Sequence, residues 1–280
     1  MPVPTGQASF LDIQNTFGGS NPIAMTEYYG AATGIPASGQ ISVNDFRGKE
    51  PASIALVYAT YLTIPKTSGT GFQNYNLPNL PQTTQVGDII IMTSHAIYFP
   101  NNTSYPNAYN LSGTGATLIS GNYGLWSYKM PVVTGYRVMT SQTNNLGSIY
   151  GKRDGGGDPR LFVACLRRTG STSSVTTGGL STYRAWSGTQ AWTVPTSSAT
   201  SGKLVVAVVN YTGIINEPNQ KISVSSVTPT YNTDPFLTAG NSRYGNMVNL
   251  YNAVPSGNLT GTIPADGFSS AGANTWWLAC

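Results

Sequence analysis

A mainly β protein is predicted, with a short helical N-terminal segment followed by two tandem antiparallel β-sandwich domains of the jelly-roll-like kind. One observation is that runs of apolar and β-branched residues alternate along the chain with clusters of Gly, Pro, Asn and Ser, as strands alternate with turns. A second is that no long amphipathic helical pattern follows residue 50. The predicted strands cover residues 53–62, 88–92, 136–139, 161–165, 203–209 and 221–227.

The division into two sandwich domains depends on an internal repeat. Gly87 and Cys165 bracket one unit, which begins with a glycine before an apolar strand and ends with a closing apolar run. Gly202 and Cys280 bracket a second unit of the same length and pattern. Repetition at a fixed spacing indicates duplicated structural units. The predicted sandwich domains are residues 51–170 and 171–280.

Two related blocks in the first 50 residues match as G-Q-x-S-x-x-D, at residues 6–12 and 39–45. A serine side chain can accept the backbone N–H three residues later, and an acidic residue at that position favours a helix N-terminus. Each block then reaches a glycine, the usual residue after a short helix. We therefore expect a helix at about 9–17 and a single helical turn at about 42–47.

A third helical piece is expected between these blocks, from Asn21-Pro22 to Tyr28-Tyr29. The three pieces are short, and we expect that they cannot bury a core alone. The prediction is that residues 1–50 form an attachment element, covered by the rest of the chain or by another protein.

The composition favours a folded protein with an uncharged surface. Only 9% of the residues are charged, whereas 11% are aromatic. Such a surface suits a protein packed in an assembly, where burying charges would be costly. The net charge of +4 comes without a clustered basic stripe, so nucleic-acid binding is not expected. No signal peptide and no run of membrane-span length is recognised.

Residues that could perform chemistry are few, and we expect no catalytic, metal or cofactor site. His95 is the single histidine, so neither a Ser/His/Asp triad nor a histidine metal cluster can be specified. Asp154 and Asp158 flank three glycines; this loop could hold calcium, but a glycine-rich hairpin loop is the simpler interpretation. Cys165 and Cys280 are expected to be buried free thiols rather than a disulfide.

Aromatic side chains are the remaining candidates for recognition. A group of them lies in an Asn- and Pro-rich stretch that could contact a receptor or partner, or could pack over a sandwich edge. This candidate partner loop contains Tyr98, Phe99, Tyr105 and Tyr109. Four tryptophans are expected in the core or at a domain interface: Trp186, Trp192, Trp276 and Trp277.

The N-terminal sequence DIQNTFGGSNPIAMTEYYG at residues 12–30, followed by IPASGQISVNDFRGK at residues 35–49, resembles a block that opens many virion proteins of tailed phages. Marine and cyanobacterial phages are well represented among them. The resemblance covers about residues 6–49. It implies that this segment docks the protein on the particle, through apolar side chains. The candidate docking residues are Phe10, Ile13, Phe17, Tyr28, Tyr29 and Phe46.

The resulting expectation is a structural component of a phage virion, made in the host cytoplasm and associated with the tail or tail fibres. Its partners would be other virion proteins, further copies of itself in a trimer or ring, and a host surface glycan or protein. Two alternatives remain open at this point: a decoration protein on the capsid, and a carbohydrate-binding module. The resemblance covers proteins of several names and does not choose among locations on the particle.

Overall fold

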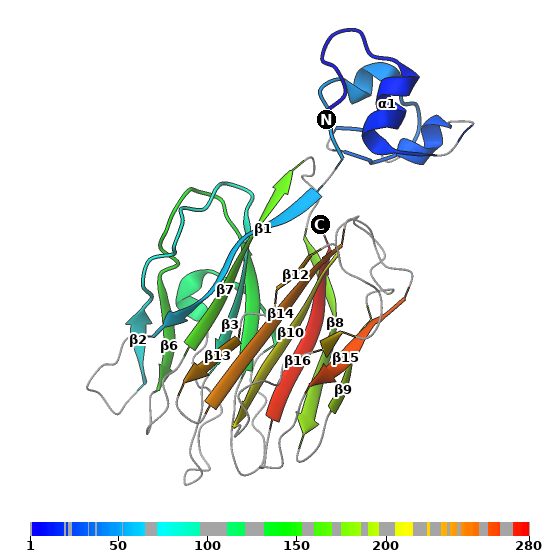
Figure 1. The fold of residues 1–280 in the computed structure, drawn as a ribbon. Helices are drawn as coiled ribbons and strands as arrows, with labels where there is room; N and C mark the ends of the chain where they lie inside the picture. Colours follow the sequence, from blue (N-terminus) through cyan, green and yellow to red (C-terminus); the bar gives the residue numbers. More distant parts are fainter. Residues whose placement is uncertain are drawn as a thin grey trace.

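The computed structural model describes the chain over residues 2–19, 21, 24–32, 34–36, 38–51, 53–64, 72–95, 111–120, 132–152, 160–169, 175–185, 190–195, 205–214, 223–224, 231–233, 236–239, 242–251, 257–263 and 271–279. The fold is mainly β, with several antiparallel sheets, and the described residues contain one short α-helix (Figure 1). The predicted fold class is confirmed at this level.

Local capping interactions create the helical pieces at the N-terminus. Helix α1 (Phe10–Phe17) begins with a capping box between Ser9 and Asp12, and the 3-10 helix η2 (Val43–Phe46) begins with the same box between Ser42 and Asp45. Between them lies a second 3-10 helix, η1 (Met25–Tyr28). The predicted helix and single turn are therefore confirmed, and both capping boxes come from the repeated G-Q-x-S-x-x-D blocks.

Residues 2–50, here called the N-terminal lobe, bury a core of their own. Its centre is a set of three rings, because Phe17, Tyr28 and Phe46 contact one another edge to face at centroid distances of 5.7–6.2 Å. The expectation that these short pieces could not bury a core alone is wrong. The buried residues of this core are Val3, Ile13, Tyr28, Ala31, Ala32, Ile35 and Phe46.

The two ends of the lobe are joined by backbone hydrogen bonds. The N–H of Val3 donates to the carbonyl of Lys49 at 2.8 Å, and the N–H of Gly48 donates to the carbonyl of Val3 at 2.9 Å. Gly48 adopts a positive φ of 68°, which lets the chain turn out of η2. Figure 1 shows the lobe beyond one end of the sheets, with the chain passing directly from it into β1.

The first half of the remaining chain forms one large and one small sheet. The large sheet has the order β1-β7-β3-β5-β4, and the small sheet pairs β2 with β6. A 3-10 turn, η3 (Ser112–Thr114), precedes β4. The strands are β1 (Ser53–Thr63), β2 (Phe72–Asn76), β3 (Ile89–His95), β4 (Thr117–Ser120), β5 (Val132–Val138), β6 (Ser148–Lys152) and β7 (Arg160–Thr169).

The second half repeats this plan. Its large sheet has the order β12-β14-β10-β16-β8, with β13 also paired to β14, and its small sheet has the order β11-β15-β9. The strands are β8 (Thr176–Ala185), β9 (Gln190–Val194), β10 (Val205–Ile214), β11 (Ser223–Val224), β12 (Tyr231–Thr233), β13 (Phe236–Ala239), β14 (Ser242–Tyr251), β15 (Leu259–Ile263) and β16 (Ala271–Ala279).

Both halves share the same connectivity. In each large sheet the first strand of the half lies beside its last strand, as β1 beside β7 and β8 beside β16. The last strand then pairs with a central strand, β3 or β10, and that strand pairs with β5 or β14. In each small sheet the second strand of the half pairs with the last but one, as β2 with β6 and β9 with β15.

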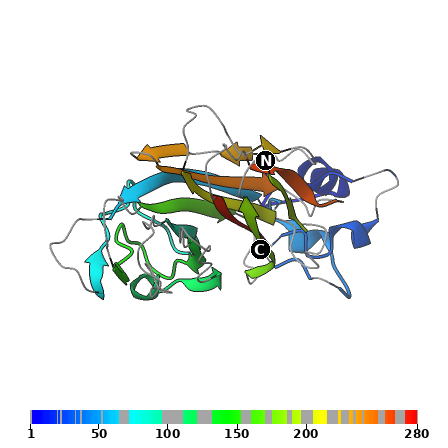
Figure 2. The ribbon, with the colours of Figure 1, turned by 90° about the horizontal axis from the view of Figure 1, so that it is seen from below.

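The two large sheets pack face to face around a common apolar core. In Figure 2 the orange and yellow strands of the second sheet lie over the blue and green strands of the first. Residues of both sheets contribute to this shared core, so the two halves meet through a buried interface. Its buried members are Ile54, Ile89, Ile91, Phe162, Ala164, Leu166, Val248, Leu250, Trp276 and Leu278.

Strand β7 is buried on both faces. Phe162, Ala164 and Leu166 point into the shared core, whereas Leu161, Val163 and Cys165 belong to another core, which includes Tyr75 of β2 and Ile149 of β6. Burial on both faces explains why β7 has a continuous apolar run rather than an alternating pattern.

The tryptophan prediction is confirmed for the three that lie in described strands, Trp192, Trp276 and Trp277, which are all buried. Trp186 lies outside the described residues. No helix in the described part of the chain is long and apolar enough to cross a membrane.

Candidate attachment surface

The predicted docking residues are partly buried in the lobe and partly exposed on it. Ile13, Tyr28 and Phe46 are at most 3% exposed, and Phe17 packs against the same core. Ile13, Tyr28 and Phe46 therefore build the core of the lobe, and Phe17 is partly buried against it. Tyr29 is half-buried, and its hydroxyl donates a hydrogen bond to the carbonyl of Gly39.

Phe10 is the predicted docking residue that faces solvent, with 49% of its surface exposed. Its neighbour Leu11, which sequence reasoning did not select, is 61% exposed. Val86, Leu118, Tyr150 and Leu180 are the other large apolar residues exposed in the described part of the chain, and none of them adjoins another in the sequence. Within the described part of the chain, Phe10 and Leu11 are therefore the two exposed large apolar residues that are adjacent in the sequence, and both lie in the first turn of α1.

The capping box determines this orientation. The Ser9 hydroxyl and the Ser9 N–H both donate to Oδ2 of Asp12, at 2.7 and 2.8 Å, and the Asp12 N–H donates back to the Ser9 hydroxyl at 3.2 Å. These hydrogen bonds lower the pKa of the Asp12 carboxyl from its ordinary value. With the first turn held in this way, Ile13 points into the core and the two residues after Ser9 point outward.

A hydrogen bond from Tyr28 closes the C-terminal end of α1. The Tyr28 hydroxyl donates to the carbonyl of Gly18 at 2.7 Å, which satisfies a carbonyl at the helix end. Burial, with a smaller contribution from the charge of Glu27, raises the pKa of Tyr28, so this hydroxyl stays protonated and keeps donating.

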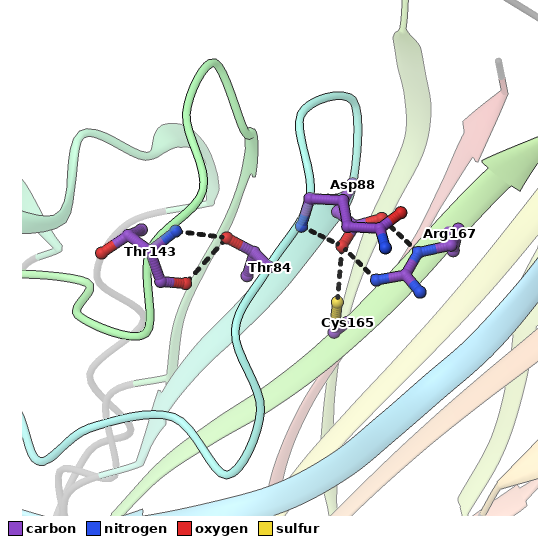
Figure 3. Close-up of polar contacts among 6 residues, drawn as sticks. Thr84, Asp88, Thr143, Cys165 and Arg167 are labelled. Carbon is purple, nitrogen blue, oxygen red and sulfur yellow. Dashed lines mark hydrogen bonds and ion pairs between the residues drawn. The ribbon is translucent and has the colours of Figure 1, made fainter.

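A second candidate site is the buried polar network at the start of β3 (Figure 3). Asp88 is 1% exposed and accepts two hydrogen bonds from Arg167, with both N···O distances at 3.0 Å. The N–H of Gln85 donates to the same carboxylate at 2.7 Å, and the Cys165 thiol lies 3.6 Å from it. Thr84, in the same turn, exchanges hydrogen bonds with the backbone of Thr143.

The electrostatics of this network indicate a structural role. Burial and the nearby Asp88 carboxylate raise the pKa of the Cys165 thiol to about 12, which removes the thiolate needed for nucleophilic chemistry. Burial alone would raise the pKa of Asp88, but the hydrogen bonds from Arg167 and Gln85 outweigh it, and the pKa is lowered. Asp88 therefore stays ionised and fastens β3 to β7. The prediction that Cys165 is a buried free thiol is confirmed.

Most of the remaining predicted site residues lie where the structure does not describe the chain. Asp154 and Asp158, Cys280 and the candidate partner loop of Tyr98, Phe99, Tyr105 and Tyr109 lie outside the described residues. His95 closes strand β3. Within the described ranges, no group of three or more His, Cys, Asp or Glu side chains is placed to hold a metal.

Comparison with known proteins identifies no relative of this chain. No family model matches the chain, and no curated protein and no solved structure is significantly similar to it.

Proposed function

We propose that this protein is a structural component of a tailed-phage virion, associated with the tail or tail fibres, and that it attaches through its N-terminal lobe. The main support for the proposal is that the phage-like sequence block and the folded lobe have nearly the same boundaries. The block that resembles the opening of phage virion proteins covers residues 6–49, and the lobe with its own core covers residues 2–50. A sequence block that corresponds to one folded unit is what a transferable attachment module requires.

The β-body supports an assembly role. We infer that residues 51–170 and 171–280 are two duplicated units of the jelly-roll-like kind, because their large and small sheets repeat one strand order. Double-sheet jelly rolls occur in viral capsid and lectin domains. A surface with few charges suits contacts with neighbouring virion proteins, with further copies of this chain in a trimer or ring, or with a host surface glycan or protein. The proposed role is non-catalytic.

Electron microscopy of intact particles labelled with an antibody against the β-body tests this proposal. Label on the tail or its fibres is the expected result. Label spread over the head would instead favour a capsid decoration protein, attached through the same lobe. Particles without label, when the antibody recognises the purified protein, would contradict a virion role. Pre-absorbing the antibody with purified protein is the matched control.

A further inference from the structure

We propose that Phe10 and Leu11 form the anchor by which the lobe attaches, and that its partner is an uncharged apolar pocket on a different protein of the particle. This inference builds on the proposed virion role. It replaces a docking surface spread over six aromatic and aliphatic residues with one defined pair at the first turn of α1.

The internal repeat shows that the fold does not require an apolar side chain at the position of Leu11. Residues Ser9–Ile13 and Ser42–Phe46 carry the same capping box, and both end in a fully buried core residue. In the second block the position of Leu11 is occupied by Asn44, which is exposed and polar. A helix start with the same capping box is therefore built with a polar side chain at this position. An exposed leucine there is explained by contact with something outside the lobe.

The charge around the anchor defines the chemistry of its partner. Asp12 is the single charged residue among residues 1–26. Its carboxylate is already hydrogen-bonded to Ser9 within the cap. The helix therefore offers two apolar side chains beside one carboxylate that is held within the cap, and the apolar side chains are the main surface available to a partner at this point. We expect attachment that depends on apolar burial and is insensitive to salt.

The size of the anchor distinguishes between a second copy and a preformed pocket. Two half-exposed side chains offer on the order of 200 Å² of apolar surface. A stable interface buries about 800 Å² on each partner, so mutual contact of two such tips would be too small to hold two copies together. Insertion into a pocket of a larger partner is the arrangement in which a few residues supply most of the binding energy.

Complementation of a phage that lacks this gene tests the anchor. The double variant Phe10→Ala, Leu11→Asn places at position 11 the residue that the second block already tolerates. The matched control is Leu118→Asn, because Leu118 is similarly exposed, at 51%, but lies on strand β4. We expect the double variant to join particles at least about tenfold less than the wild-type chain, and the control to join normally. Hydrogen exchange of residues 2–50 should stay protected, which shows that the lobe is still folded.

A photo-crosslinking residue at position 10, with position 118 as control, identifies the partner in purified particles. A crosslink from position 10 to another virion protein supports the proposal. Normal incorporation of the folded double variant overturns it, and so does a crosslink from position 10 to a second copy of this chain. These outcomes all presuppose wild-type protein in the particle. Its absence there would instead contradict the proposed function.

Discussion

Replacing Phe46 by alanine should unfold the N-terminal lobe and leave the β-body intact. Phe46 is fully buried and makes edge-to-face contacts with Phe17 and Tyr28 at 5.7 and 5.8 Å. Truncation of a buried phenylalanine costs about 3–5 kcal/mol. A core in a unit of this size rarely supplies more than about 3–5 kcal/mol in total. The substitution therefore removes most or all of the free energy of unfolding of the lobe.

Two probes separate the lobe from the body. All five tryptophans follow residue 120, so tryptophan fluorescence reports on the β-body alone. Hydrogen exchange measured by mass spectrometry reports on peptides of residues 2–50. In Phe46→Ala, the lobe peptides should exchange as an unfolded chain does, while the fluorescence melting temperature stays at the wild-type value.

Phe10→Ala is the matched control, because Phe10 lies in the same lobe but is half exposed. It should cost less than about 1 kcal/mol and leave the lobe peptides protected. Two results would refute the reasoning. Protected lobe peptides in Phe46→Ala would show that the three-ring core does not hold the lobe together. A matching fall of the tryptophan transition would show that lobe and body unfold as one unit.

The polar network and the glycines of β8 give further predictions. Arg167→Ala leaves Asp88 buried without its partner and should destabilise the body by about 2–4 kcal/mol in chemical denaturation. Because folding lowers the pKa of Asp88, its ionised carboxylate stabilises the folded body at pH values above its unfolded pKa of about 3.9. This stabilisation should be lost as the pH falls through the folded pKa. A melting temperature that stays constant across acid pH would contradict this prediction. Cys165 should resist a maleimide at pH 8 until the body unfolds, as peptide mass spectrometry can show. Gly179→Ala should lower the melting temperature, because φ is +66° and the added Cβ would lie 2.6 Å from the Trp277 ring. An unchanged melting temperature would show that the backbone and the ring move apart freely.

Local interactions could be predicted from the sequence, and long-range ones could not. The capping boxes depend on hydrogen bonds between residues three apart, so the two S-x-x-D blocks were sufficient to place α1 and η2. The lobe core was missed because it depends on contacts between distant residues, such as Phe17 with Phe46 and Val3 with Lys49. The contrast between Leu11 and Asn44 is visible in the sequence itself, because the two blocks align residue by residue.

The same distinction holds in the β-body. Strands β1, β3, β7 and β10 were predicted because their apolar runs are long. Strand β8 was missed because its glycines indicate a loop, yet Gly178 and Gly179 leave the space that the Trp277 ring occupies. The pairing of Asp88 with Arg167 was also missed. It depends on the register that places Ile89 opposite Leu166, which a single sequence does not contain.

The lobe is joined to the body through strand β1. The chain passes from Lys49, which is bonded to Val3 inside the lobe, to Ser53 at the start of β1. Strand β1 pairs with β7 from Ser53 opposite Thr169 to Thr63 opposite Arg160. Because β7 is buried on both faces and belongs to both cores, a pull on the lobe is transmitted along the whole β1–β7 ladder. Attachment through the lobe would therefore load the β1–β7 strand pair, whose residues contribute to both cores of the body.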